Sequence, residues 1–101
     1  MAGFAVCGTS RDEDAGASTG EIRTLFVSPG YWRCGVGREL MDSALADLRR
    51  RGYLSCTVWS FAANERANAF YDAAGFARDG AERTEAVWAD LLEVRYRQSL
   101  A

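Results

Sequence analysis

The sequence predicts a mixed α/β fold, in which a mostly antiparallel sheet contains one central parallel βαβ unit and is flanked by helices. Three observations support this prediction. Strand-like runs at residues 21–27 and 54–61 enclose one helical segment, which is typical of a βαβ unit. A second helical segment follows, and a strictly alternating run at residues 93–100 ends the pattern. Because the chain has 101 residues and 49% are hydrophobic, we expect a single domain over residues 1–101.

The first strand is predicted at residues 3–8, and the polar stretch 9–20 is predicted to be a hairpin loop. This loop carries three consecutive acidic residues. We expect them to form a solvated tip rather than a cation site, because no EF-hand pattern surrounds them. These residues are Asp12, Glu13 and Asp14.

The second strand is predicted at residues 21–27 and is expected to be at least half buried. In a regular strand, successive side chains point to opposite faces. One face is therefore expected to hold Ile22, Thr24 and Phe26, and the other Arg23, Leu25 and Val27.

The first helix is predicted at residues 35–51 and ends at Gly52. The arginines at 49–51 fall in its last turn, where cations favour the negative end of the helix dipole. We prefer this interpretation to a basic patch for a partner. Apolar residues at spacings of three and four form one stripe for the core. The stripe consists of Val36, Leu40, Met41, Ala44, Leu45 and Leu48.

The second half of the chain begins with a predicted strand at residues 54–61. A helix at residues 64–74 follows, with Asn64 as its N-cap and Gly75 as its end. The segment 77–92 is expected to hold one more strand and a turn.

The last strand, at residues 93–100, alternates as expected near a sheet edge. One predicted face holds Val94, Tyr96, Gln98 and Leu100, and the other holds Glu93, Arg95, Arg97 and Ser99.

Composition narrows the function. The net charge of −2 argues against a nucleic-acid partner. The chain has no histidine, which removes the commonest general base and metal ligand, and we expect no metal site. The sequence shows neither a signal peptide nor an apolar run long enough to span a membrane. We therefore expect a cytoplasmic protein with no membrane partner.

The stretch 25–40, LFVSPGYWRCGVGREL, joins a strand, a proline turn and a glycine-containing loop that opens into a helix. Gly35 and Gly37 carry no side chain, so backbone N–H groups can approach a bound group closely. The first helical turn leaves its donors unpaired. This arrangement predicts an anion site that suits a pyrophosphate.

A second motif lies at residues 64–76, NERANAFYDAAGF. With the first motif, it resembles the GNAT superfamily of acyl-CoA-dependent N-acetyltransferases, and the resemblance covers residues 3–100. That family shows a V-x-P turn, an R/Q-x-x-G-x-G/A loop and an N-x-x-A-x-x-x-Y-x-x-x-G-F helix. This chain has Trp32 where the family usually has Gln or Arg. The strand and helices that normally precede the position of Gly3 are absent.

The resemblance implies an acyl-CoA N-acyltransferase-like fold and acetyl-CoA as cosubstrate. Backbone groups of the strand at 25–27 would pair with the pantetheine arm, and the loop at 32–38 would hold the pyrophosphate. The implied cofactor-binding residues are Leu25, Phe26, Val27, Trp32, Arg33, Cys34, Gly35, Val36, Gly37, Arg38, Asn64 and Tyr71.

The resemblance also implies two catalytic residues. Tyr71 matches the tyrosine that faces the cofactor sulfur in many members, and packing beside Phe70 is the alternative explanation. Glu21 matches a glutamate that accepts the amine proton, and a surface carboxylate at the strand end is the alternative. The acceptor would be a small-molecule amine or a protein N-terminus.

Three hypotheses follow. The first is an N-acetyltransferase that transfers an acetyl group to a primary amine by direct attack on the thioester. The second is an acyl-CoA-binding module without catalysis, and the third is a non-binding remnant. Because a strand that begins at Gly3 leaves a sheet edge uncovered, we expect a homodimer.

Overall fold

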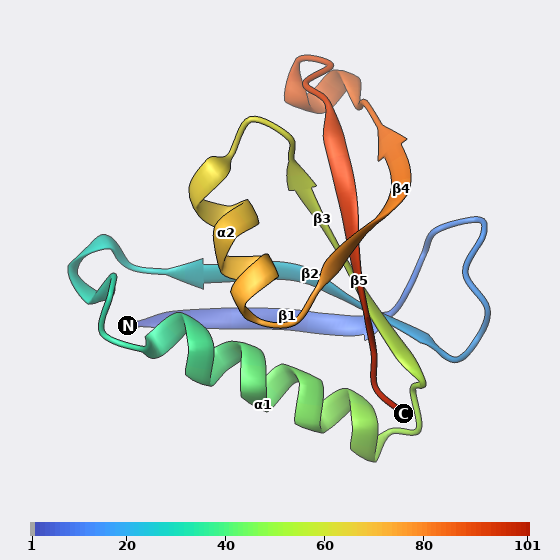
Figure 1. The fold of residues 1–101 in the computed structure, drawn as a ribbon, viewed down its shortest axis with the longest axis horizontal. Coiled ribbons are helices and arrows are strands. Elements are labelled where there is room, and N and C mark those ends of the chain that lie inside the picture. The colour runs from blue at the N-terminus through green and yellow to red at the C-terminus, as the bar shows by residue number, and fades with distance from the viewer. Residues whose placement is uncertain (1) are drawn as a thin grey trace.

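The computed structural model describes residues 2–101 as five strands and two α-helices (Figure 1). The strands form one sheet in the order β1-β2-β3-β5-β4. Short 3₁₀ turns lie at Pro29–Tyr31 and Ala86–Trp88. The elements are β1 Gly3–Thr9, β2 Thr19–Val27, α1 Val36–Arg50, β3 Ser55–Phe61, α2 Glu65–Ala73, β4 Ala77–Arg83 and β5 Glu93–Ser99.

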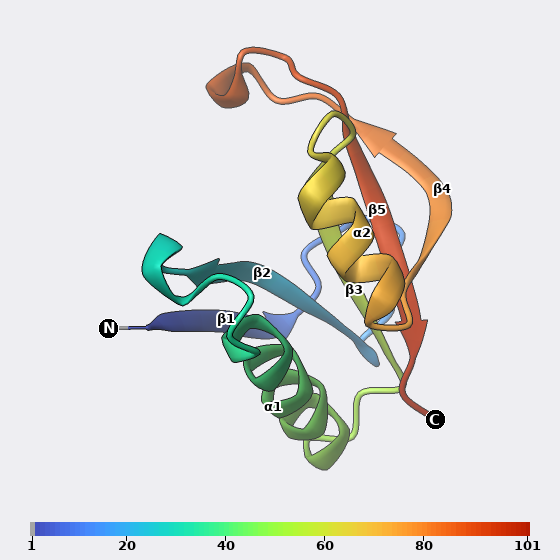
Figure 2. The same ribbon diagram turned by 60° about the vertical axis from the view of Figure 1, so that its left-hand side comes forward.

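The predicted fold class is confirmed. Strands β2 and β3 are parallel and are joined through α1, whereas every other neighbouring pair is antiparallel. The extra strand expected within residues 77–92 is β4. Figures 1 and 2 show how the two helices flank the sheet. Among residues 2–101, no helix has the length and apolar character needed to cross a bilayer.

The core lies between the helices and one face of the sheet. On α1, the predicted stripe is buried at Met41, Ala44, Leu45 and Leu48, and only half buried at its first two positions. These side chains belong to one cluster with residues from the strands and α2. The strand and α2 members are Ile22, Cys56, Val58, Tyr71, Ala74, Phe76, Val94, Tyr96 and Leu100.

The predicted alternation along β2 is wrong after Ile22. Val6 pairs with Thr24 while Cys7 pairs with Ile22, so Arg23 is an extra residue in β2, a bulge. The bulge shifts the alternation by one position. Leu25 therefore packs against the core together with Ile22, and Phe26 is 44% exposed. A regular period of two cannot reveal such an insertion.

Strand β5 lies near a sheet edge as predicted, one strand in, but its expected exposed face is wrong for its first half. It lies between β3 and β4, and both faces of its first half are buried. Arg95 is 5% exposed because its guanidinium is enclosed by carboxylates. It donates to Asp14 at 2.8 Å, to Asp79 at 2.7 Å and to Asp12 at 3.1 Å.

The expected solvated tip at residues 12–14 holds for the exposed Glu13, whereas Asp12 and Asp14 pair with Arg95. Asp12 accepts a hydrogen bond from the Trp59 indole at 3.0 Å besides pairing with Arg95. The loop between β1 and β2 therefore folds over the sheet face opposite the helices. Charged side chains of this loop belong to an ionic cluster with Arg95. The local sequence pattern is typical of a solvated tip and does not reveal this long-range pairing.

Candidate functional site

The sheet opens between β2 and β3. These strands pair only from Thr19–Ile22 with Ser55–Val58. Farther on, β2 stays paired with β1 and β3 stays paired with β5, so the two strands diverge (Figure 2). The last residues of β2 therefore lack a partner strand on the side facing β3. This opening leaves backbone groups of the segment 25–27 available to an extended ligand.

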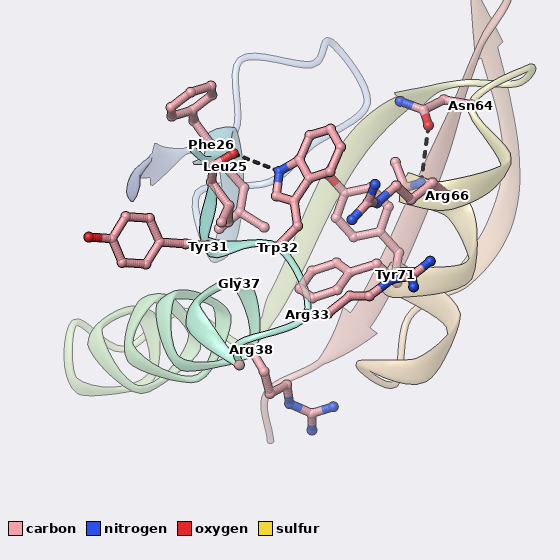
Figure 3. Close-up of a pocket in the computed structure, with 14 residues that line it drawn as sticks. Leu25, Phe26, Tyr31, Trp32, Arg33, Gly37, Arg38, Asn64, Arg66 and Tyr71 are labelled. Carbon is pink, nitrogen blue, oxygen red and sulfur yellow. Dashed lines mark hydrogen bonds between the residues drawn. The ribbon is translucent and has the colours of Figure 1, made fainter. Parts of the chain in front are cut away.

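A cleft of about 540 Å³ lies at this opening on the helix side (Figure 3). Its walls come from the end of β2, the loop before α1 and the first turns of α2. The structure brings together ten of the twelve predicted cofactor-binding residues there; Cys34 and Val36 are not among its lining residues. The lining residues are Leu25, Phe26, Val27, Tyr31, Trp32, Arg33, Gly35, Gly37, Arg38, Asn64, Arg66, Ala67, Phe70 and Tyr71.

The two loop glycines serve different purposes. Gly35 adopts φ +82°, a left-handed conformation, and a side chain there would meet no atom within 4 Å. A Cβ on Gly37 would instead lie 3.3 Å from Phe70 Cε1 and 3.5 Å from Val27 Cγ2. Gly35 thus provides the turn into α1, whereas Gly37 permits the close approach of α1, α2 and β2.

The start of α1 presents free backbone donors. Glu39 N is the first amide that donates back, to Gly35 O at 3.0 Å. The amides of Val36, Gly37 and Arg38 therefore have no intrahelical acceptor. Among residues 2–101, the Arg33 guanidinium has no partner, while Arg38 donates to Asp42 at 3.1 Å. The loop offers amides and an unpaired cation to an anion.

Trp32 folds back across the cleft. Its indole N–H donates to Val27 O at 2.8 Å, and the Arg66 guanidinium lies 3.8 Å from the ring centroid (Figure 3). Sequence reasoning missed Arg66, because its position opposite Trp32 depends on how α2 docks. Arg66 forms no ion pair with residues 2–101, so it supplies a second available cation.

Side-chain hydrogen bonds fix the start of α2. Asn64 Oδ1 accepts from Ala67 N at 3.1 Å, which confirms Asn64 as the N-cap. The buried Asn68 accepts from Ser60 Oγ at 2.7 Å and donates to Ala62 O at 3.1 Å. These bonds tie α2 to β3 and its following turn. Asn68 was missed as a positioning residue because the motif treats it as a variable position.

Tyr71 projects from α2 with its ring buried against Phe70, Phe76 and Tyr96, at centroid distances of 5.7, 6.1 and 5.6 Å. Its hydroxyl makes no hydrogen bond with residues 2–101, and the residue lines the cleft. Burial raises the pKa of the phenol. Tyr71 is therefore a protonated phenol that packing holds at the cleft.

Glu21 lies apart from Tyr71. It lines a second cleft of about 390 Å³. The walls of this cleft include residues from the sheet face opposite the helices. Glu21 is 6% exposed, so it is not the surface carboxylate of the alternative explanation. Its Oε1 accepts from Arg11 N at 3.2 Å, and no arginine side chain within residues 2–101 pairs with it.

Known proteins resemble this chain in sequence and in fold. The sequence model described as the acetyltransferase (GNAT) family matches residues 1–76. The chain belongs to this family. The match includes the diverging strands, the glycine loop and α2. These are the parts that build the first cleft of this GNAT chain.

A curated relative is the mycothiol acetyltransferase of Beutenbergia cavernae, which is 45% identical over 60 residues. The match covers 59% of this chain and 20% of that protein. This GNAT chain therefore spans about a fifth of the length of the curated relative.

Solved structures agree on the fold. A protein described as belonging to the GNAT family of acetyltransferases, from Desulfovibrio desulfuricans, is 25% identical with a TM-score of 0.84. The superposition covers 100% of this chain and 63% of that one. The NatC complex bound to Gag peptide and CoA contains a chain with 19% identity and a TM-score of 0.83. That superposition covers 99% of this chain and 62% of the other.

Proposed function

We propose that this chain carries an acetyl-CoA-dependent N-acetyltransferase site, in which a primary amine attacks the thioester directly. The observation that carries the proposal is the first cleft, where the unpaired end of β2 meets the free amides of α1. A solved neighbour contains CoA. The unpaired edge of β2, where backbone N–H and C=O groups alternate, suits the amide-bearing pantetheine arm. The free amides beside Arg33 suit a pyrophosphate.

Bound acetyl-CoA would supply an activated acyl group as a thioester. The amides before and within the first turn of α1 would hold the phosphates. The resemblance assigns a backbone N–H of the segment 25–27 to the thioester carbonyl, where it would stabilise developing negative charge. No side chain is needed for that role.

Tyr71 is proposed as the donor to the departing sulfur. Its phenol is protonated at neutral pH, because the ordinary pKa of a tyrosine is about 10 and burial raises the pKa of Tyr71 further. Full transfer of this proton to a thiolate is uphill, so Tyr71 would act through a hydrogen bond that strengthens in the transition state. Glu21 is proposed to receive the amine proton, directly or through water.

Tyr71→Phe tests the proposal because it retains the ring and its packing. Acetyl-CoA affinity and melting temperature should change little, while turnover falls by about 10²-fold, a usual size for a general-acid contribution. Affinity is measured by calorimetry, and turnover by release of free thiol with a panel of amines. Tyr53→Phe is the matched control: Tyr53 lines neither cleft, and turnover should be retained.

Equal turnover in wild type and Tyr71→Phe would refute the donor role. If wild type binds acetyl-CoA but no amine produces thiol, the chain is a binding module rather than an enzyme. Absence of both binding and thiol release would identify the non-binding alternative.

A further inference from the structure

The second cleft combines aromatic surface with charged groups. Trp59 and Phe61 come from β3, and Trp88 comes from the connection between β4 and β5. Phe61 and Trp88 meet edge to face, with centroids 6.0 Å apart and planes at 78°. Trp88 is 52% exposed, so this apolar wall is accessible. Such a wall can receive the apolar part of a small ligand.

Most charges in the second cleft are already satisfied. Arg83 donates to both carboxylate oxygens of Glu93 at 3.3 Å, lies 3.8 Å from Glu85, and packs 4.1 Å over the Trp59 ring. Arg23 donates to Thr9 O at 2.6 Å. These groups shape the cleft but have partners of their own.

Two opposite charges remain available. Glu21 lies in the cleft without a cationic partner, and the exposed Arg11 side chain has no partner among residues 2–101. The hydrogen bond from Arg11 N to Glu21 Oε1, at 3.2 Å, places the two residues in direct contact. Glu21 and Arg11 both line the second cleft, so within the part of the chain that the structure describes this cleft holds an unpaired carboxylate and an unpaired guanidinium and suits a ligand that carries both an ammonium and a carboxylate.

We propose that the acceptor is a free amino acid with an apolar side chain. This inference rests on the proposed acetyl transfer. The amine binds at Glu21, the carboxylate binds the Arg11 guanidinium, and the side chain lies against Phe61 and Trp88. Both clefts lie along β2, because Glu21 to Arg23 line one and Leu25 to Val27 line the other.

The reaction balances without another reactant. The ammonium first loses one proton to Glu21, directly or through water. The amine nitrogen then forms a bond to the acetyl carbon, and the carbon–sulfur bond breaks. The nitrogen loses a second proton, and one proton ends on the departing thiol. The nitrogen of the product is an uncharged amide, which no longer attracts the Glu21 carboxylate, while the product carboxylate stays on the Arg11 guanidinium until release.

The test compares phenylalanine, phenylalaninamide and phenethylamine in the thiol-release assay. These amines share the ring but differ at the carboxylate. We expect kcat/KM to be about tenfold or more higher for phenylalanine, the scale of one charge-assisted bond. Arg11→Gln should remove this preference by raising KM for phenylalanine, with little change for phenethylamine. Arg49→Gln is the matched control, because that exposed arginine on α1 lies outside both clefts.

Melting temperatures of both variants check that they fold. A preference for phenylalaninamide would overturn the inference in favour of a peptide N-terminus. Equal use of phenethylamine, or an equal effect of Arg11→Gln on all three amines, would also overturn it while leaving acetyl transfer intact. Acetyl-CoA binding without thiol release from any amine would overturn the proposed function itself.

Discussion

At the scale of single residues, the first cleft depends on Trp32, which occupies the family position usually held by Gln or Arg. Its indole N–H already donates to the Val27 carbonyl oxygen, and the Arg66 guanidinium stacks over the ring. The resemblance assigns the segment 25–27 to the pantetheine arm. A ligand that pairs with Val27 O therefore competes with the indole N–H for this acceptor.

Replacing Trp32 with Phe keeps a ring and removes that donor. We expect Trp32→Phe to bind acetyl-CoA about fivefold more tightly, since one net hydrogen bond contributes about 1 kcal/mol. Calorimetry measures the affinity. Trp88→Phe, in the second cleft, should leave it unchanged. Weaker binding by Trp32→Phe would show instead that the indole contacts the cofactor.

At the scale of elements, the junction of α1, α2 and β2 is closely packed around Gly37. A Cβ there would lie 3.3 Å from Phe70, which is tighter than ordinary packing, and 3.5 Å from Val27, which is an ordinary contact. The start of α1 would have to move away from α2, and the free amides would move with it. We therefore expect a change in packing at this residue to alter cofactor binding.

Gly37→Val should abolish acetyl-CoA binding while the fold is largely retained, at a cost of about 1–3 kcal/mol for overpacking. Calorimetry and thermal unfolding measure the two effects. Gly16→Val is the matched control, because a Cβ there meets nothing within 4 Å. Unchanged affinity in Gly37→Val would exclude close packing at this junction as a requirement for binding.

At the scale of the whole molecule, the Arg95 cluster joins distant parts of the chain. Asp14 comes from the loop after β1, Asp79 from β4 and Arg95 from β5. The hydrogen bond from Arg95 lowers the pKa of Asp14 below its usual 3.8. Because the pKa of Asp14 is lower in the folded than in the unfolded state, its carboxylate stabilises the fold above about pH 4. This stabilisation is lost as the pH falls through the folded-state pKa.

Asp14→Asn should therefore reduce the stability at pH 7 and make it fall less steeply between pH 5 and about pH 2. Urea unfolding at several pH values measures both quantities. Glu13→Gln should have no effect at pH 7, because the Glu13 carboxylate has no partner among residues 2–101. An identical acid dependence in wild type and Asp14→Asn would show that this ion pair does not hold the loop.

The expected homodimer stays a prediction at this scale. Phe4 and Val6 on the edge strand β1 are 41% and 45% exposed, and the Phe4 ring lies 5.6 Å from that of Phe26. Sedimentation at micromolar concentrations can determine the oligomeric state.

The sequence by itself determined the elements, the fold class and most of the first cleft. Helical spacing identified four buried residues of α1, and Asn64 and Gly75 marked the ends of α2 correctly. These features are predictable because periodicity, caps and glycine turns are local. The loop and helix motifs likewise have fixed spacings, so Gly35, Gly37 and Tyr71 could be assigned to one site.

Only the tertiary structure decided where β5 lies, what the acidic loop does and which charges remain free in the second cleft. Arg95 is buried because Asp14 and Asp79 reach it across long sequence separations. The Arg23 bulge follows from pairing with β1, and the Arg66 stacking follows from the docking of α2. Such contacts depend on how distant segments of the chain pair with one another. Local residue patterns do not encode this pairing, because a charged residue in either segment could equally be exposed to solvent.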